Sequence, residues 1–315
     1  MKKILVTGCA GFVGSNLTER LLGEGYEVIG IDNFNDYYNP AVKEKNIQSA
    51  MSYKKFRLYR MDILDLSRLG EIFAQERPEK VIHLAARAGV RASIADPLLY
   101  AEVNVLGTVN LLKIASNAGV GQFIYGSSSS VYGNSKRLPF SEDDPCGAII
   151  SPYGASKRAA EFFVETFHRN FGLKATILRL FTVYGPRGRP DMAPALFTKA
   201  ILKGKEIGQF GNGLTSRDYT YIDDIVDGIL RALDVAFDFE IINLGNSHPI
   251  TLADFIKTLE TATGKKAKIK MLPKQAGDVE VTWANIVKAK KLLGWEARTE
   301  LPQGLAKYIE WLSQN

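Results

Sequence analysis

The sequence predicts an α/β protein with a doubly wound parallel sheet and a second, smaller α/β domain. Three observations lead to this expectation. Strand-like and helix-like segments alternate up to Leu180, a glycine-rich loop follows the first strand, and a Gly/Pro/Arg-rich loop after Leu180 interrupts both hydrophobic periods. We therefore expect residues 1–180, with 216–245 returning to them, to form a Rossmann domain, and residues 181–215 and 246–315 to form the second domain.

Length and composition exclude several classes of protein. The 315 residues are 46% apolar and 23% charged, which suits one large or two fused globular domains. The apolar run at the start is too short for a signal peptide, so we expect a cytoplasmic protein without a membrane partner. Cys9 and Cys146 are far apart and the three histidines do not cluster, so no metal site is expected. The formal charge of +6 comes without a basic arm, so no nucleic-acid partner is expected.

The first strand and the loop after it predict a dinucleotide site. An apolar, β-branched run at Lys3–Thr7 leads into the loop, and helical periodicity follows from Ser15 to Glu24. Glycines permit the tight turn and the approach of backbone to a pyrophosphate, while the helix N-terminus supplies free N–H groups. The loop residues expected to contact the cofactor are Gly8, Gly11, Phe12, Val13 and Gly14.

The second strand, Tyr26–Ile31, ends at Asp32, where a carboxylate would accept hydrogen bonds from the adenosine ribose. A carboxylate there would repel a 2′-phosphate, so the sequence favours NAD over NADP. Further strands are expected at 56–61, 81–84 and 122–127, with helices at 66–75 and 98–118. Because ligands bind at the carboxyl ends of such strands, we add Asp62, Ile63, Leu84, Ala85 and Ala86 to the cofactor site.

Tyr153 and Lys157 lie four residues apart in a helical stretch and so share one face of it. If that helix borders a nicotinamide, the ammonium and the positive ring both favour the phenolate, so the pKa of Tyr153 falls below its free value of about 10. Taken alone, the spacing favours a surface tyrosine packed on a lysine stem, because such pairs occur by chance on many helices. The surrounding motifs must therefore decide between the two interpretations.

Taken in order, the motifs resemble the extended short-chain dehydrogenase/reductase superfamily over essentially the whole chain. They are Thr7–Gly14, Asp32-Asn33, Asp62, His83–Ala86, Asn104, the serine run before Val131-Tyr132-Gly133, and Tyr153–Lys157. The resemblance implies that Ser128, Tyr153 and Lys157 are catalytic. It also implies that Asn33, Asn104, Tyr153 and Lys157 belong to the NAD site.

The C-terminal half carries features that the resemblance assigns to a nucleotide sugar. Arg217 would grip the diphosphate and Asp278 would contact the uridine ribose, while Asp223 and Asp224 are expected to cap a helix from Ile225 to Leu233. The second domain would therefore bind the nucleotide sugar. The basic run at 265–270 alternates as expected for an edge strand with one solvated face. The remaining elements are expected as strands at 175–180, 240–244 and near 269, and as helices at 252–263, 286–293 and 301–312.

Several stretches narrow the resemblance to UDP-glucuronate 4-epimerases. They are Asp32–Tyr38, Arg87–Arg91, the serines with Val131–Gly133, Phe181–Pro186 with Gly188–Ala193, and Gln275–Val279. UDP-glucose 4-epimerases usually carry arginine in place of Gln275 and asparagine in place of Thr182. One departure is Arg187, where tryptophan is commoner in UDP-glucuronate 4-epimerases.

The resemblance implies a mechanism in which Tyr153 takes the proton of the sugar 4-hydroxyl while C4 delivers hydride to NAD, giving a 4-keto intermediate. Ser128 would hydrogen-bond the same oxygen. The keto sugar would turn and regain the hydride on its other face, converting UDP-glucuronate to UDP-galacturonate. Related dehydratases and decarboxylases place acids directly before Val-Tyr-Gly, where this chain has Ser129 and Ser130. The serines therefore favour epimerisation over elimination.

A glucuronate substrate needs its carboxylate held, because a 4-ketone lies β to that carboxylate and promotes loss of CO₂. Ser129, Ser130 and Thr182 offer hydroxyl donors, and Arg91 and Arg189 are candidate charge partners. Two alternatives stay open. One is a UDP-glucose or UDP-N-acetylhexosamine 4-epimerase, and the other is a non-catalytic, NAD-sensing scaffold. The resemblance also implies a homodimer formed through the helices near 98–118 and 153–171.

Overall fold

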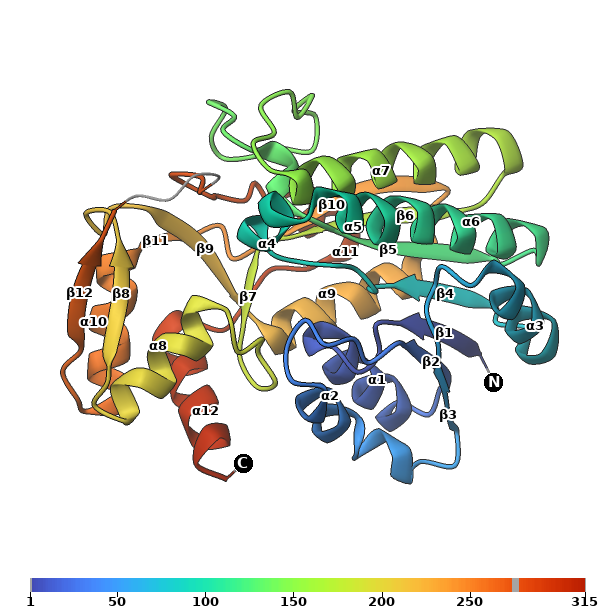
Figure 1. The fold of residues 1–315 in the computed structure, drawn as a ribbon. Coiled ribbons are helices and arrows are strands. Elements are labelled where there is room, and N and C mark those ends of the chain that lie inside the picture. Colours follow the sequence, from blue (N-terminus) through green and yellow to red (C-terminus); the bar gives the residue numbers. More distant parts are fainter. Residues whose placement is uncertain (1, 274–277, 315) are drawn as a thin grey trace.

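A seven-stranded parallel sheet forms the larger part of the computed structural model, which describes residues 2–273 and 278–314. The strand order is β10-β6-β5-β4-β1-β2-β3 (Figure 1). The strands are β1 Lys3–Thr7, β2 Glu27–Asp32, β3 Phe56–Arg60, β4 Lys80–His83, β5 Gln122–Ser128, β6 Ala175–Leu180 and β10 Phe239–Leu244. The order reverses between β1 and β4, so loops that leave the carboxyl ends of these strands diverge there and open a crevice. The predicted doubly wound sheet is confirmed.

Helices cover both faces of this sheet. Successive strand residues point to opposite sides, so apolar side chains on each side need a helix to pack against. Ile4 and Val6 of β1 pack towards α1 (Phe12–Gly23) and α9 (Ile222–Val235). Leu5 points the other way, towards α3 (Leu66–Glu76), α6 (Gly107–Asn117) and α7 (Pro152–Phe171). In Figure 1, α6 and α7 run side by side above the sheet, and α1 lies below it. The first strand is therefore buried on both faces.

The helix expected at 98–118 is divided into three parts. Helix α5 (Pro97–Ala101) passes into a π-helical turn at Glu102–Leu106 and then into α6, and the short α4 (Val90–Ala95) precedes them. π-Turns often mark functional sites, and this one carries Asn104. By length and composition Pro97–Asn117 could cross a membrane, but half of its most apolar window is buried inside the protein. The other half of that window is not buried inside the protein.

The C-terminal part contains two small sheets, seen to the left of the large sheet in Figure 1. Strands β7 (Thr182–Tyr184), β9 (Ser216–Tyr221) and β11 (Pro249–Thr251) form one, with β9 central. Strands β8 (Glu206–Phe210) and β12 (Lys268–Leu272) form the other. The accompanying helices are α8 Ala193–Leu202, α10 Leu252–Thr263, α11 Val287–Leu293 and α12 Leu301–Gln314.

Several sequence expectations need correction. Helices α2 (Pro40–Ile47) and α8 and strands β7, β8, β9 and β11 were not predicted. The strands and α2 have short apolar runs, and α8 directly follows the Gly/Pro/Arg-rich loop. The expectation that only one face of the basic run at 265–270 is solvated is wrong. Ile269 and Met271 of β12 are 46% and 60% exposed, and Lys268 and Lys270 are exposed too, because β12 pairs with β8 in a sheet of only two strands.

The expected capping role of the aspartates before α9 is also wrong. The helix begins at Ile222, so Asp223 and Asp224 lie inside its first turn, where they still favour the positive end of the helix dipole. Its N-cap residue is Tyr221, which makes no side-chain cap hydrogen bond. The Asp224 carboxylate instead accepts a hydrogen bond from the Thr299 backbone N–H at 3.0 Å. Asp224 therefore ties α9 to the segment before α12.

Candidate active site

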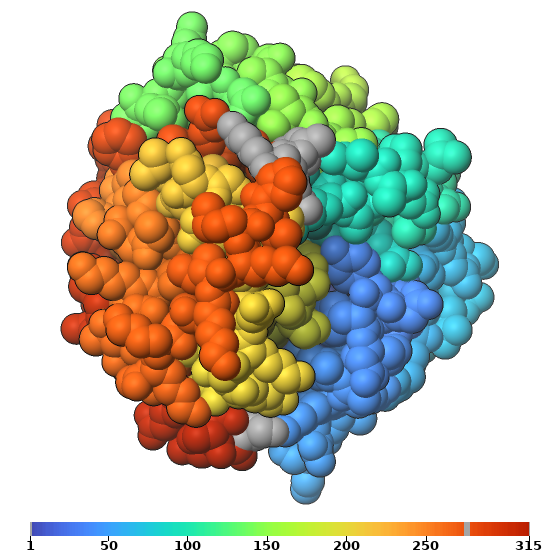
Figure 2. All heavy atoms as spheres, turned by 60° about the vertical axis from the view of Figure 1, so that its left-hand side comes forward, coloured from blue at the N-terminus to red at the C-terminus, as the bar shows by residue number. Residues whose placement is uncertain are grey.

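A cavity of about 880 Å³ runs along the carboxyl ends of the sheet strands and under the C-terminal elements. Figure 2 shows the face where the yellow and orange C-terminal segments meet the blue N-terminal ones. The predicted site residues that line the cavity are Gly8, Gly11, Phe12, Val13, Gly14, Asp32, Asn33, Asp62, Ile63, Leu84, Ala85, Ala86, Arg91, Ser128, Ser129, Ser130, Tyr153, Lys157, Thr182, Arg189, Arg217 and Asp278. Residues from both halves of the chain therefore face the same space.

Among the predicted site residues, Asn104 alone does not line the cavity and lies behind its wall. Its side chain is 1% exposed and pairs with both backbone groups of Arg87, accepting from the N–H at 2.7 Å and donating to the carbonyl at 2.9 Å. It also donates to Ser156 Oγ at 2.9 Å. Asn104 therefore holds the loop after β4 in place against α7. Gln275, which the sequence singled out, lies outside the described residues.

The glycine loop has a shape that only glycines permit. A Cβ on Gly14 would lie 2.0 Å from the carbonyl oxygen of Gly8, and one on Gly8, at φ 70°, would lie 2.8 Å from the backbone nitrogen of Ala85. Helix α1 begins directly after Gly11, which makes no side-chain cap hydrogen bond. The first N–H groups of α1 thus face the cavity without a side chain in front of them, which fits the pyrophosphate of a dinucleotide.

The Asp32 carboxylate at the end of β2 is 6% exposed and oriented by its neighbours. It accepts hydrogen bonds from the backbone N–H groups of Ala10 at 3.1 Å and Phe34 at 2.8 Å. Lys43 of α2, whose role the sequence did not indicate, lies 3.6 Å from it and also lines the cavity. Burial lowers the pKa of Lys43, while Asp32 opposes the shift. Asn33 donates to Asp62 at 2.6 Å, which joins the ends of β2 and β3.

Tyr153 lies in the first turn of α7, where Ser151 caps the helix by accepting from the Gly154 N–H at 3.1 Å. Burial raises the pKa of Tyr153, while the Ser128 hydroxyl and the charge of Arg189 lower it. Lys157, one turn after Tyr153 in α7, donates its ammonium to the Gly126 carbonyl at 2.7 Å.

Lys157 lies 3% exposed beneath the cavity, over the ring of Tyr125 at 4.7 Å. Burial lowers the pKa of Lys157 to about 7, and the nearby carboxylate of Glu161 opposes this shift. A lysine titrating near neutrality in a cavity is typical of a functional site. Lys157 thus combines an unusual ionisation with a position on the same helical face as Tyr153.

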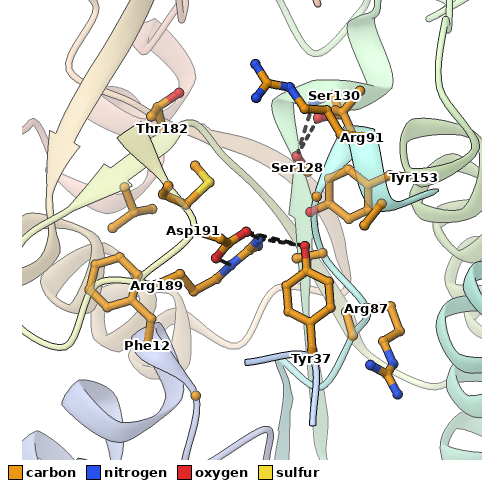
Figure 3. Close-up of a pocket in the computed structure, with 18 of the residues that line it drawn as sticks. Phe12, Tyr37, Arg87, Arg91, Ser128, Ser130, Tyr153, Thr182, Arg189 and Asp191 are labelled. Atoms are coloured by element: carbon orange, nitrogen blue, oxygen red, sulfur yellow. Dashed lines mark hydrogen bonds and ion pairs between the residues drawn. The ribbon is translucent and has the colours of Figure 1, made fainter. Parts of the chain in front are cut away.

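The serine run forms the turn between β5 and the loop that packs on α7. Ser128 ends β5, and a 3₁₀ turn follows at Ser129–Tyr132. Ser128 Oγ accepts from the Ser130 N–H and donates to Ser130 Oγ, both at 3.2 Å. A Cβ on Gly154 would lie 2.6 Å from the Ser130 carbonyl oxygen. This close packing brings the hydroxyls of Ser128 and Ser130 next to Tyr153 (Figure 3).

Arg189 is held by two residues, Tyr37 and Asp191, to which the sequence analysis gave no role. Its Nε donates to Asp191 Oδ1 at 3.1 Å, and its Nη2 donates both to Asp191 Oδ2 and to the Tyr37 hydroxyl, the latter at 3.1 Å. The three side chains meet below Tyr153 in Figure 3, with Thr182 across the cavity. Burial alone would raise the pKa of Asp191, but its contact with Arg189 lowers it overall.

The nucleotide-sugar residues expected at the C-terminal side lie together. Arg217 lines the cavity, donates to the Ser216 carbonyl at 2.9 Å, and has its pKa lowered by burial. Asp278 forms an ion pair with Arg91 at 3.3 Å, and Arg91 stacks on the ring of Phe210 at 4.4 Å. Arg91 therefore spans from α4 to the C-terminal side. Within the described residues, no cluster of three or more His, Cys, Asp or Glu side chains could hold a metal ion.

Comparisons with known proteins show which proteins this chain resembles. The model of the NAD dependent epimerase/dehydratase family matches residues 4–245. A UDP-glucuronate 4-epimerase of Thermodesulfobacterium geofontis is 44% identical over 99% of this chain and 96% of that protein. The Bacillus cereus UDP-glucuronic acid 4-epimerase, solved with UDP-glucuronic acid and NAD, superposes with a TM-score of 0.94 at 39% identity, covering 99% of both chains.

A Thermotoga maritima UDP-glucose 4-epimerase, solved with UDP-glucose, superposes with a TM-score of 0.91 at 35% identity, again over 99% of both chains. Since the family model covers most of the sequence and these relatives cover nearly all of it, this chain belongs to the NAD dependent epimerase/dehydratase family.

Proposed function

We propose that this protein is an NAD-dependent UDP-sugar 4-epimerase that interconverts UDP-glucuronate and UDP-galacturonate. The observation that carries the proposal is the joint placement of Ser128, Tyr153 and Lys157 in the cavity, beside Ser129 and Ser130 rather than acids. The Thermodesulfobacterium and Bacillus relatives, whose names specify UDP-glucuronate, support the uronate as substrate. The Thermotoga relative keeps UDP-glucose as the second candidate.

The cofactor would lie along the glycine loop and the ends of β2, β3 and β4. We assign its pyrophosphate to the N-terminus of α1 and its adenosine ribose to Asp32. Asn33, Asp62, Ile63, Leu84, Ala85 and Ala86 would complete the pocket. When bound, NAD supplies the reversible oxidation of the sugar at C4 to a ketone and is regenerated in each cycle.

Tyr153 is the group we assign to proton transfer at the sugar 4-hydroxyl. Ser128 lowers the pKa of the phenol and would hydrogen-bond the same sugar oxygen. Lys157, anchored on the Gly126 carbonyl, would place its ammonium against the cofactor ribose. A tyrosine raised in pKa by burial keeps its proton until the charged form is stabilised, so the ionisation is coupled to the groups that enter the site.

The nucleotide sugar would occupy the C-terminal side of the cavity. We assign the diphosphate to Arg217, the uridine ribose to Asp278, and the glucuronate carboxylate to Ser129, Ser130, Thr182 and Arg189. We accordingly propose residues 1–180 with 216–245 as the NAD-binding domain, and 181–215 with 246–315 as the nucleotide-sugar domain. The cleft between them would then be the place of reaction.

We also propose that the protein is a cytoplasmic homodimer. Large apolar side chains are exposed along neighbouring helices, with Leu98 81%, Leu106 51%, Phe162 53% and Phe171 63% exposed. These residues lie on α5, the π-turn and α7, which run close together in Figure 1. A two-helix apolar face of this kind suits a self-complementary contact between two copies.

Purified protein incubated without added cofactor tests the activity. UDP-glucuronate and UDP-glucose are supplied separately, and the sugar nucleotides are then resolved. We expect conversion of UDP-glucuronate, and conversion of UDP-glucose alone would overturn that substrate. Tyr153→Phe is the matched control, expected to keep bound NAD while losing turnover. A wild-type protein that binds NAD and converts neither sugar would favour the NAD-sensing alternative.

A further inference from the structure

We propose that Asp191 and Tyr37 are positioning residues that fix the Arg189 guanidinium so that its remaining amino group meets the carboxylate of a uronate sugar. The proposal rests on the function proposed above and adds two specificity-determining residues to it. Neither residue is assigned to catalysis or to the nucleotide.

The orientation of Arg189 is set by hydrogen bonds on two of its three nitrogens. The Asp191 carboxylate accepts hydrogen bonds from both Nε and Nη2 of Arg189. The Tyr37 hydroxyl accepts a second hydrogen bond from Nη2. Tyr37 in turn donates to Asp191 Oδ2 at 3.3 Å, which closes a three-residue ring of contacts. Across the part of the chain that the structure describes, no acceptor engages Nη1. This amino group is therefore the one left to meet a ligand.

The Arg189 guanidinium is largely buried, so its orientation affects how it can bind a carboxylate. The Arg189 side chain is 16% exposed, whereas that of Asp191 is 41% exposed. Solvent therefore screens Asp191, which reduces its repulsion of an incoming carboxylate. A free arginine loses much rotamer entropy on binding a ligand, and a pre-oriented one loses little.

Three distant segments meet to build this arrangement. Tyr37 follows β2 on the cofactor side, Arg189 and Asp191 follow β7, and Gly89 precedes α4. A Cβ on Gly89, which has φ 107°, would lie 2.5 Å from the Tyr37 hydroxyl and 3.3 Å from Arg189 Nη2. The loop after β4 thus packs directly on the contact. Tyr37 thereby links the loop that carries Asp32 and Asn33 to the residue proposed to recognise the sugar.

Tyr153 provides a second readout, because the charge of Arg189 lowers its pKa. The ring of Tyr100 meets that of Tyr153 edge-on, with ring centroids 6.2 Å apart. The titratable and charged groups around the phenol are Tyr37, Tyr100, Tyr125, Lys157, Arg189 and Asp191. If Arg189 loses its neutral anchor Tyr37, its field at the phenol weakens and the pKa of Tyr153 rises.

The experiment compares Asp191→Asn, Asp191→Glu and Tyr37→Phe with wild type as purified with bound NAD. Asp36→Asn is the matched control, since it removes an exposed carboxylate from the same loop as Tyr37. We expect Asp191→Asn to raise KM for UDP-glucuronate about tenfold, the usual effect of a lost charge-assisted contact. The inhibition constants of UDP and UDP-glucose should stay unchanged, and Asp191→Glu should restore KM in part. In Tyr37→Phe, which removes one anchor of Arg189 without removing a charge, the acidic limb of the kcat profile should move to higher pH.

Three results would overturn the proposal. KM for UDP-glucuronate could stay unchanged, it could fall because Asp191 merely competes with the substrate, or UDP could lose affinity in parallel. If Asp191→Asn does not fold, Tyr37→Phe gives the same test with a smaller rise in KM, about threefold. If the wild type converts only UDP-glucose, the proposed function fails. The acidic limb of Tyr37→Phe measured with UDP-glucose then still shows whether Tyr37 positions Arg189.

Discussion

The Glu161 carboxylate accepts a hydrogen bond from the Ser127 hydroxyl at 2.6 Å, directly before Ser128 in β5. It also lies one helical turn after Lys157 in α7. Arg179 binds the same carboxylate through two nitrogens, at 3.0 and 2.8 Å, and both side chains are 1% exposed. Glu161 therefore connects the strand that ends at the serine run to the lysine of the candidate site.

Replacing Glu161 should change both stability and the pH dependence of activity. Glu161→Gln leaves the buried Arg179 without its counter-ion, so we expect a loss of roughly 3–5 kcal/mol in unfolding free energy. The carboxylate raises the pKa of Lys157, so its removal lowers that pKa below about 7. The ammonium is then lost at lower pH, and the alkaline limb of the kcat profile should move down. If Glu161→Gln folds and the alkaline limb of its kcat profile does not move, the proposed effect of Glu161 on Lys157 is contradicted.

The element boundaries were predictable where a local pattern was complete. The ranges Lys3–Thr7, Ala175–Leu180 and Leu252–Thr263 appear in the structure as the sequence predicted them, because each has an uninterrupted hydrophobic period. The π-turn at Glu102–Leu106 has no such signal, since its residues continue the helical period. Its contact with Arg87 exists only in the folded chain.

The charged contacts of the site could not be predicted for a related reason. Tyr37 and Arg189 are 152 residues apart, and nothing in either neighbourhood shows that they meet. Glu161 and Arg179 occur in segments where charged residues would usually face solvent, yet both are buried. The motif resemblance indicated residues that line the cavity, whereas the side chains that hold them depend on packing between segments.

We expect that alanine at Gly14 disturbs the NAD site, whereas alanine at Gly23, in the same helix, does not. A Cβ at Gly14 would overlap the Gly8 carbonyl oxygen, while one at Gly23 would meet no atom within 4 Å. We expect Gly14→Ala to shift the glycine loop and to purify with little NAD. Gly23→Ala should keep its NAD and gain up to about 1 kcal/mol of stability from helix propensity. Cofactor content by absorbance and thermal unfolding measure both effects, and equal NAD content in the two variants would refute the expectation.

Arg187 joins the loop after β7 to α1 through an ion pair with Glu19 at 2.7 Å. Its backbone has φ 66°, in the left-handed region that disfavours residues with a Cβ. Arg187→Gly and Arg187→Ala both lose the ion pair, but glycine also relieves the strain. We expect the glycine variant to be more stable than the alanine variant by roughly 1 kcal/mol.

A double-mutant cycle of Arg187→Ala with Glu19→Gln then isolates the ion pair in chemical denaturation. The two side chains are 16% and 27% exposed, so we expect a coupling of about 1 kcal/mol, at the upper end for partly exposed pairs. Additive single effects would show that the contact contributes no stability of its own.

Asn104 should act on NAD retention through the loop that it holds. Its amide pairs with both backbone groups of Arg87, next to Ala85 and Ala86 in the cavity wall. Asn104→Ala leaves that N–H and carbonyl without their partner, at a cost of about 1–3 kcal/mol each where they are buried. We expect lower thermal stability and faster loss of bound NAD on dilution, with kcat at saturating NAD close to wild type.

Asn104→Asp distinguishes the effect of the hydrogen bonds to Arg87 from the effect of side-chain volume. The carboxylate is the same size and still accepts from the Arg87 N–H, but it has no donor for the Arg87 carbonyl or for Ser156. Two oxygens would face each other, so this variant should lose NAD at least as readily as Asn104→Ala. If Asn104→Asp instead behaved like wild type while Asn104→Ala did not, volume alone would explain the effect. The paired hydrogen bonds to Arg87 would then have no part in holding the cofactor.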